Sequence, residues 1–348
     1  MEYRPLGRTG LNISAICLGT MTYGEQNTEA EGHAQMDFAL DRGINFFDTA
    51  ELYAVPPKAE TQGSTERIIG SWFAARGNRD KVILGTKVVG RSVNTWFRDD
   101  GSPAELSRAQ IFEAIDKSLK RLRTDYIDLY QIHWPDRAVP AFGSNATVFR
   151  VCEGPEHPIA ETVDILADLV KAGKIRHYGL SNESAWGAMR YAHCAEASGA
   201  PRPQSIQNSY SLVNRTFEVN LAELALREDM GLLAYSPLAQ GYLTGKYAGG
   251  ALPPGSRKAL FNRLTRYEKP GAEEAFAKYV ALAREFGLDP AQMALAFVTT
   301  RPFVTSTIIG ATTLAQLETN IDSIGVAITP EIEARIDAIH QQHCNPCP

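Results

Sequence analysis

Eight short β-favouring runs, separated by helix-like stretches, constrain the fold of this chain more than any other feature of its 348 residues. Strand and helix in alternation require right-handed parallel crossovers, and eight such units favour a closed (β/α)8 TIM barrel over an open sheet. No flexible linker or change of composition divides the chain, so we expect one domain over residues 1–348. The runs are Ile13 to Leu18, Ile44 to Phe47, Lys81 to Thr86, Tyr126 to Ile132, Ile175 to Leu180, Gln204 to Gln207, Gly231 to Tyr235 and Thr305 to Ile309.

Three segments lie outside this alternation. Turn residues between short extended runs in Tyr3 to Leu11 predict a small β-hairpin before the barrel. Pro135 to Pro158 after the fourth strand and Leu238 to Pro270 after the seventh are too long for simple connections. Both long loops leave strand carboxyl ends, where loops usually carry function.

Charge and cysteine content narrow the class of protein. A net charge of −5 gives no general electrostatic reason to bind nucleic acid or an anionic membrane, so we expect a small-molecule partner. The chain shows neither a signal-peptide pattern nor an apolar run of about 20 residues, and its five scattered cysteines suit a reducing cytoplasm. Cys344 and Cys347 have metal or redox spacing but no second pair, so we expect a loose tail over 344–348 and no metal site.

Four titratable residues follow successive strands. Asp48 and Tyr53 come after the second run, Lys87 after the third and His133 after the fourth. Ligands bind at strand carboxyl ends in parallel α/β folds, so we expect these side chains to meet. An ammonium at Lys87 would lower the pKa of Tyr53 from about 10, while Asp48 balances the buried charge. His133 could then bond a substrate oxygen, although singly it also fits a core histidine.

This arrangement resembles the catalytic tetrad of the aldo-keto reductases. The likeness is greatest to the bacterial Tas-type members, which are relatives of the voltage-gated potassium channel β subunits. It implies NADPH-dependent reduction of aldehydes or ketones to alcohols, with Tyr53 as proton donor, Lys87 and Asp48 tuning it, and His133 orienting the carbonyl. The segments that carry the likeness are Leu18 to Thr22, Gln131 to Pro135, Gly173 to Arg176, Tyr235 to Leu238 and Ile309 to Thr313.

The resemblance also implies a site for NADP(H). Tyr235 would stack on the nicotinamide ring, because an aromatic face can hold a flat ring. Hydroxyl and amide side chains at Ser181, Asn182 and Gln207 would bond its carboxamide. The full set of implied cofactor residues is Gly19, Thr20, Met21, Asp48, Ser181, Asn182, Gln207, Tyr235, Ser236, Pro237, Leu238, Gly241, Lys246, Arg257, Gly310, Thr312, Gln316 and Asn320.

The residues expected to bind the adenosine end of the cofactor differ from those of the relatives. The resemblance places the 2′-phosphate and adenine at Lys246, Arg257, Gln316 and Asn320, and two cations near a phosphate predict NADPH over NADH. Many relatives have glutamate where Thr319 stands, so a ribose or adenine contact would be weaker here. Another branch has two further cations in this region, so the phosphate clamp would rest mainly on Lys246 and Arg257.

The substrate pocket is less constrained by sequence. Tyr23 and Trp134 are expected to form walls, but the loops that shape the pocket leave the substrate open, and the oligomeric state is open too. Two other functions stay possible. One is a cofactor-sensing interaction subunit with slow turnover, like the channel β subunits. The other is a barrel lyase or hydrolase that binds no nucleotide. No G-x-G-x-x-G follows any strand, which argues against a Rossmann domain.

Overall fold

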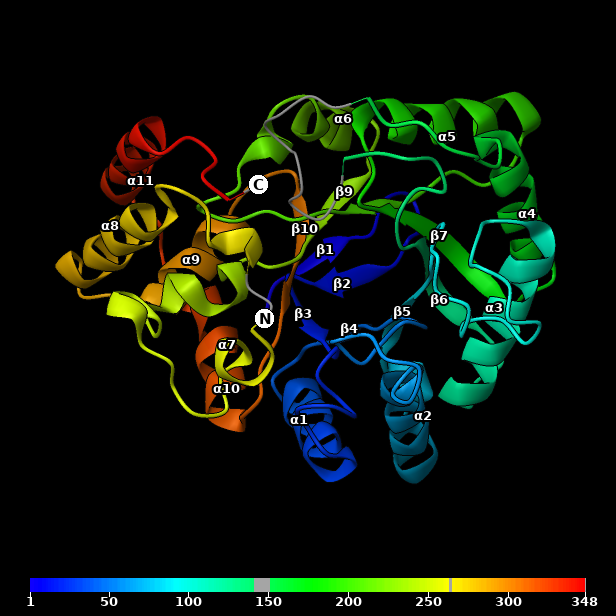
Figure 1. Cartoon of the computed structure of the whole chain (residues 1–348), viewed down its shortest axis with the longest axis horizontal. Coiled ribbons are helices and arrows are strands. Elements are labelled where there is room, and N and C mark those ends of the chain that lie inside the picture. Colours follow the sequence, from blue (N-terminus) through cyan, green and yellow to red (C-terminus); the bar gives the residue numbers. More distant parts are fainter. Residues whose placement is uncertain (141–150, 263–264, 348) are drawn as a thin grey trace.

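The computed structural model describes residues 1–140, 151–262 and 265–347, so part of the long loop after the fourth barrel strand, residues 141–150, lies outside the described residues. Parallel strands close into a barrel in the order β10-β3-β4-β5-β6-β7-β8-β9, with helices around it (Figure 1). The predicted (β/α)8 barrel is therefore confirmed. Its strands are β3 (Ile16–Gly19), β4 (Phe46–Asp48), β5 (Ile83–Val88), β6 (Ile127–Ile132), β7 (Ile175–Ser181), β8 (Ser205–Gln207), β9 (Gly231–Ala234) and β10 (Val304–Ile309).

Helices cover the outside of the barrel, and local sequence signals set several of their ends. Thr28 and Glu31 form a reciprocal capping box at the start of α1. Asp289 accepts two main-chain N–H groups at the start of α9, where proline occupies the first turn. The α-helices are α1 (Glu29–Asp41), α2 (Ser64–Arg76), α3 (Arg108–Leu122), α4 (Ile159–Lys171), α5 (Ala185–Ser198), α6 (Leu221–Arg227), α7 (Arg257–Phe261), α8 (Ala272–Glu285), α9 (Pro290–Thr299), α10 (Leu314–Asp322) and α11 (Pro330–Gln342).

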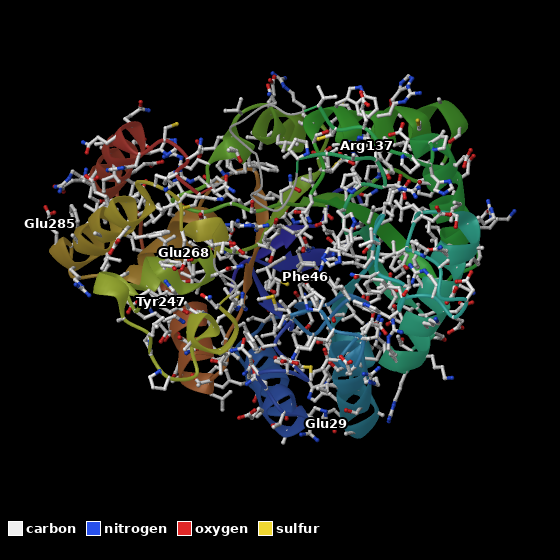
Figure 2. The ribbon with its side chains drawn as sticks, viewed as in Figure 1. Glu29, Phe46, Arg137, Tyr247, Glu268 and Glu285 are labelled. Carbon is white, nitrogen blue, oxygen red and sulfur yellow. The ribbon has the colours of Figure 1, made fainter. Side chains whose placement is uncertain are left out.

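The predicted N-terminal hairpin is present as β1 (Tyr3–Pro5) paired with β2 (Asn12–Ser14). It takes the start of the first β-favouring run, so the barrel strand itself begins only at Ile16. Leu6 and Ile13 of the hairpin pack inside the barrel with Phe46, which Figure 2 labels near the centre of the ring. The hairpin thus closes the amino end of the barrel and leaves ligands the other end.

The long loop after β9 is more ordered than a simple connection. It contains α7 and short 3-10 turns, the first over Ala239–Thr244 and a later one over Thr265–Tyr267. Its later turn is held by the end of the chain, because Cys347 is fully buried with its Sγ atom 3.7 Å from the carbonyl oxygen of Tyr267.

The expectation of a loose tail is therefore wrong for the described residues. Arg215 donates its main-chain N–H to Asn345 Oδ1 at 2.6 Å, and Cys347 donates its own to the carbonyl oxygen of Val213 at 3.3 Å. A thiol behaves as a small apolar group, which favours its burial here. Cys344 is exposed, and both thiols are free.

In the part of the chain that the structure describes, no helix has the length and apolar character needed to cross a membrane.

Candidate active site

The structure brings the predicted tetrad together at the carboxyl end of the barrel. Asp48 ends β4, Lys87 lies near the end of β5, and His133 directly follows β6. Lys87 Nζ donates to Asp48 Oδ2 at 2.7 Å and to the carbonyl oxygen of Thr49 at 2.8 Å. The same Nζ atom lies 5.0 Å from the centre of the Tyr53 ring, and that ring meets the His133 ring edge to face with centroids 5.8 Å apart.

Burial and charge together set the protonation of these groups. Burial raises the pKa of Tyr53 above its ordinary value, and the nearby Lys87 only partly opposes that rise. The net lowering of the Tyr53 pKa that was expected from Lys87 is therefore not found. Burial acts to lower the pKa of Lys87, but Asp48 and Tyr53 outweigh it and the net pKa is raised. Burial, aided by Lys87, holds the pKa of His133 well below its ordinary value, so this imidazole is neutral.

The Asp48 carboxylate is held from both sides. Gln207 Nε2 donates to Asp48 Oδ1 at 2.8 Å, and Gln131 Nε2 donates to the same oxygen at 3.2 Å. The other oxygen accepts from Lys87, so both oxygens of the carboxylate have partners and its orientation is fixed. Gln131 was not predicted as a site residue. Its place in β6, two residues before His133, is the signal that could have found it, since side chains alternate along a strand.

The residues expected around the nicotinamide also come together. Tyr235 donates its hydroxyl to Asn182 Oδ1 at 2.7 Å, and Asn182 Nδ2 donates to the carbonyl oxygen of His133 at 2.8 Å and to Ser181 Oγ at 3.1 Å. Ser181 Oγ in turn donates to the carbonyl oxygen of Gln207 at 2.8 Å. A hydrogen-bonded chain therefore runs from the proposed stacking ring to the tetrad.

The first barrel loop joins this group through main-chain contacts. Gly19 pairs in register with Asp48, and Thr20 donates its hydroxyl to the carbonyl oxygen of Asp48 at 2.8 Å. Met21 is half-buried, and its carbonyl oxygen accepts from the Val55 N–H at 2.9 Å. These contacts tie the loop after β3 to the segment that bears Tyr53.

The loop that starts with Ser236-Pro237-Leu238 contains several residues with a left-handed backbone. Ser236, Ala239, Gln240 and Gly241 have φ values of 56°, 48°, 55° and 104°. Successive main-chain N–H groups in a turn, or in alternating right- and left-handed conformations, can form concavities that bind anions. A Cβ atom at Gly241 would lie 2.6 Å from Lys246 Cε, so the glycine is what lets this lysine cross the turn.

The remaining adenosine residues form a second group on the connection from β10 to α10. Gln316 Oε1 accepts from the Thr312 N–H at 3.0 Å, and Asn320 Nδ2 donates to the carbonyl oxygen of Gly310 at 3.2 Å. A Cβ atom at Gly310 would meet nothing within 4 Å, so open space lies beside the connection. Thr319 turns its hydroxyl back to the Ala315 carbonyl oxygen at 3.0 Å. Arg257 is the first residue of α7, in the loop after β9.

The structure places Tyr23 and Trp134, the two residues expected to line the substrate pocket, in different surroundings. Tyr23 does not line the pocket: its side chain is fully buried in the core and its hydroxyl donates to Gln35 Oε1 at 3.2 Å. The turn after β3 directs this ring under the helix layer, where an aromatic residue buries the most surface. Trp134 is half-buried, with its ring centroid 4.9 Å from that of His133 and its Nε1 donating to the Arg91 carbonyl oxygen at 2.9 Å. It stays a candidate wall.

Sequence reasoning missed a buried ion pair beside the site. Glu51, two residues before Tyr53, is 1% exposed and pairs with the buried Arg98 at 2.9 Å. The signal in the sequence was Glu51 itself, a charged residue between the two predicted catalytic residues Asp48 and Tyr53. Its partner lies in the loop after β5 and could not be identified from spacing.

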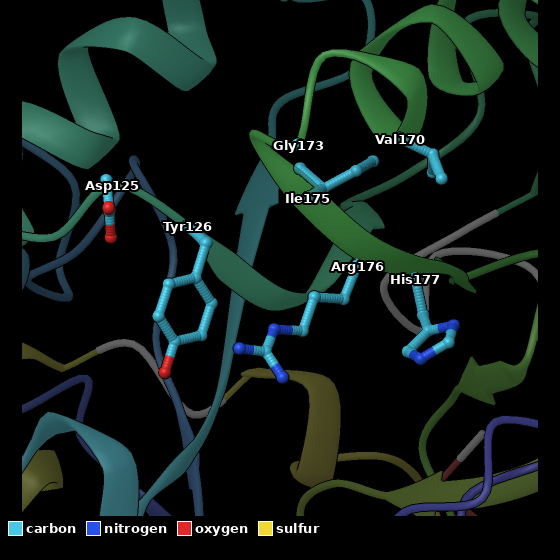
Figure 3. Close-up of a pocket in the computed structure, with 7 residues that line it drawn as sticks. All are labelled: Asp125, Tyr126, Val170, Gly173, Ile175, Arg176 and His177. Atoms are coloured by element: carbon cyan, nitrogen blue, oxygen red, sulfur yellow. The ribbon is translucent and has the colours of Figure 1, made fainter.

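A hollow lies at the opposite end of the barrel. Figure 3 shows the residues that line it. It has a volume of about 560 Å³ and lies where β6 and β7 begin, with Tyr126, Arg176 and His177 among its lining residues. Tyr126 is stacked between the guanidinium groups of Arg79 and Arg176, each 4.1 Å from the ring centre. Cation–π stacking of this kind stabilises the strand starts.

Comparison with known proteins agrees with the geometry. Residues 15–341 match the family model described as the aldo/keto reductase family. The chain is 50% identical to Protein tas of Escherichia coli (strain K12) over 350 residues, covering all of both chains. It is 36% identical to the uncharacterized oxidoreductase YrpG of Bacillus subtilis (strain 168), covering 95% of this chain and 94% of the relative. It is also 32% identical to a probable voltage-gated potassium channel subunit beta of Oryza sativa subsp. japonica, covering 98% of this chain and 97% of the relative. This chain therefore belongs to the aldo/keto reductase family.

Proposed function

We propose that this protein reduces a small aldehyde or ketone to the alcohol with NADPH, and that Tyr53 donates the proton. The observation that carries the proposal is the position of Lys87 Nζ, which bonds Asp48 at 2.7 Å and lies 5.0 Å from the Tyr53 ring centre. When bound, NADPH supplies the hydride. The residues of the chain then bind and orient the reactants and provide the proton.

Tyr53 and His133 have complementary tasks in this proposal. The phenol of Tyr53 gives its proton to the carbonyl oxygen, and the Lys87 ammonium stabilises the tyrosinate that remains. His133 is neutral, and its Nδ1 atom is buried with no hydrogen-bond partner in the described part of the chain. A neutral imidazole can donate one hydrogen bond, which would orient the carbonyl without competing as the acid.

The cofactor site is supported by the fit of its residues. The left-handed turn at Ser236 to Gly241 suits a pyrophosphate, and Lys246 crosses that turn, so its ammonium would reach a phosphate. Tyr235 and Asn182 are already joined by a hydrogen bond at 2.7 Å and would contact the nicotinamide. An ammonium that bonds the 2′-phosphate would favour NADPH over NADH.

The direct test replaces the proposed acid. Tyr53→Phe should lower kcat for aldehyde reduction by about 10²–10⁴-fold, because general acid catalysis contributes about that much. NADPH affinity, measured by quenching of intrinsic fluorescence, should stay near normal because Tyr235 and not Tyr53 stacks on the ring. An unchanged rate of NADPH oxidation would reject Tyr53 as the acid.

A cofactor-binding subunit with slow turnover is the second candidate, and the similarity to the Oryza protein favours it. It predicts tight NADPH binding with no cofactor oxidation under a saturating panel of aldehydes. Rapid oxidation with any member of that panel would support the enzyme. A chain that binds no nucleotide at all would instead favour a barrel lyase or hydrolase.

A further inference from the structure

The turn that carries Tyr53 is fastened to the end of β5 by Glu51. Pairing between β4 and β5 ends at Asp48 opposite Gly85, but main-chain bonding continues beyond it. Thr49 donates its N–H to the Gly85 carbonyl oxygen at 2.8 Å, and Glu51 donates its own to the Lys87 carbonyl oxygen at 3.2 Å. Glu51 thus extends the contact between the two strand ends that bear Asp48 and Lys87.

Beyond this point the main chain turns away from β5, and the Glu51 side chain supplies the hydrogen-bond acceptor that a neighbouring strand would provide. Its Oε1 atom accepts the N–H of Val89 at 2.8 Å, a contact that a neighbouring carbonyl would otherwise make. Gln62 Nε2 donates to the main-chain carbonyl oxygen of Glu51 at 2.7 Å, so that carbonyl has a partner too. The Glu51 side chain therefore ties its own turn, two residues before Tyr53, to Val89, which lies two residues beyond Lys87.

Arg98 makes this buried carboxylate tolerable. Its Nη1 atom donates to Glu51 Oε2 at 2.9 Å and its Nη2 atom to Oε1 at 3.2 Å, in the forked geometry typical of arginine and carboxylate. The Arg98 side chain has no exposure to solvent, and Gln110 Oε1 accepts from its Nε atom at 3.1 Å. A buried charge needs such a partner, because an unpaired one is strongly destabilising.

We propose that Glu51, held by Arg98, is a positioning residue that fixes the Tyr53 phenol relative to the Lys87 ammonium. The inference rests on the proposed function, in which that distance controls proton donation. Displacement of a catalytic group by about 1 Å can lower a rate by about 100-fold, so a small relaxation of this turn would be visible.

The chain offers a matched control at the start of β5, the strand that Glu51 contacts beyond its other end. Asp128 Oδ2 accepts the N–H of Leu84 at 3.0 Å and a bond from Arg79 Nη2 at 2.7 Å, and its side chain is 6% exposed. It is thus a buried carboxylate that caps a main-chain N–H at the start of β5 and pairs with an arginine. Its contacts lie away from the Tyr53 turn.

The experiment compares Glu51→Gln with Asp128→Asn in the full chain. Fluorotyrosine placed at position 53 reports the ionisation of that phenol by ¹⁹F NMR across a pH titration, with no need for turnover. We expect Glu51→Gln to move the Tyr53 pKa upward, because the phenol loses part of the opposing effect of Lys87. Its kcat should fall about 10–100-fold with NADPH affinity within about 2-fold of the wild type. Asp128→Asn should lose stability with both readouts unchanged.

Equal effects of the two substitutions on the Tyr53 titration, or no effect of Glu51→Gln, would overturn the proposal. If Glu51→Gln does not fold, Arg98→Lys is measured instead, since it keeps the charge pair but loses the fork, and it should shift the titration in the same direction by less. Absence of carbonyl reduction in the wild type would reject the proposed function. The NMR comparison would still decide the positioning role, so the two failures are distinguishable.

Discussion

The interaction between Asp48 and Lys87 makes a quantitative prediction about stability. Lys87 is fully buried and donates to the charged Asp48 carboxylate and to the uncharged carbonyl oxygen of Thr49. In Asp48→Asn the amide must face either Lys87 or the Gln207 and Gln131 donors with its own NH2 group, so one donor meets another in either orientation. Removing one partner of a buried pair costs about 3–5 kcal/mol, and we expect a loss in that range at pH 7.

The pH dependence of that loss provides a sharper check. In the wild type the pKa of Lys87 is raised, so its stabilising effect is complete below the unfolded value of about 10.4 and is lost only above it. Without Asp48, burial is less opposed and the folded pKa should fall below that value. The unfolded state then binds more protons, so the variant should gain stability relative to the wild type as pH rises. The variant can avoid an unpaired buried ammonium by folding with Lys87 deprotonated, which costs about 4.6 kcal/mol at pH 7. This cost sets an upper limit on the loss of stability, and the limit falls by about 1.4 kcal/mol for each pH unit above 7.

Urea unfolding of the wild type, Asp48→Asn, Lys87→Met and the double variant between pH 6 and 9 would measure this. The double variant should be more stable than Asp48→Asn alone, because an apolar side chain replaces the unpaired ammonium. A loss below about 1 kcal/mol in Asp48→Asn, with the same pH slope as the wild type, would refute the reasoning. It would mean that Lys87 finds other compensation in the folded state.

Two further predictions concern the cofactor and the rate. Lys246→Ala should weaken NADPH by at least about 10-fold more than NADH in fluorescence titrations, since a charge-assisted bond contributes roughly 1.5–3 kcal/mol, and equal losses would place the 2′-phosphate elsewhere. Carbonyl reduction should vary little from about pH 6 to 9, because the pKa of His133 lies well below about 6.5 and that of Tyr53 above about 10. Reduction needs the protonated phenol, so the rate should fall as pH rises through the Tyr53 pKa. An inflection near pH 6.5 that His133→Gln abolishes would contradict this assignment.

The barrel could be predicted because its signals are local. Apolar runs of strand length and helix starts such as Thr28 with Glu31 are read from neighbouring residues, and the closed order of strands then follows from handedness. The boundary between β2 and β3 could not be predicted, since both strands lie in one apolar run and only tertiary packing separates them at Ala15. The docked tail was missed for a similar reason: Cys347 is buried by Val213 and Tyr267, which are distant in sequence.

The same division holds at the candidate site. Asp48, Lys87 and His133 could be placed together because strand ends in a barrel share one rim. Arg98 acts through a contact between two loops, and no spacing rule specifies such a contact. Tyr23 was misplaced because the direction of a side chain in a loop depends on backbone angles that the sequence does not give. Reading polar residues inside strands as well as after them would have found Gln131.

The buried charges themselves bear on the choice between an enzyme and a binding subunit. A buried ion pair adds little net stability, and apolar replacements of similar volume are often neutral or stabilising. Lys87 and Asp48 form such a buried pair at the carboxyl end of the barrel. A protein that only binds a nucleotide would need hydrogen-bonding and stacking groups there, but no buried ion pair. An ammonium held 5.0 Å from a phenol ring is what proton donation requires, because it stabilises the tyrosinate left after transfer. This placement supports chemistry at the carbonyl more than nucleotide binding alone.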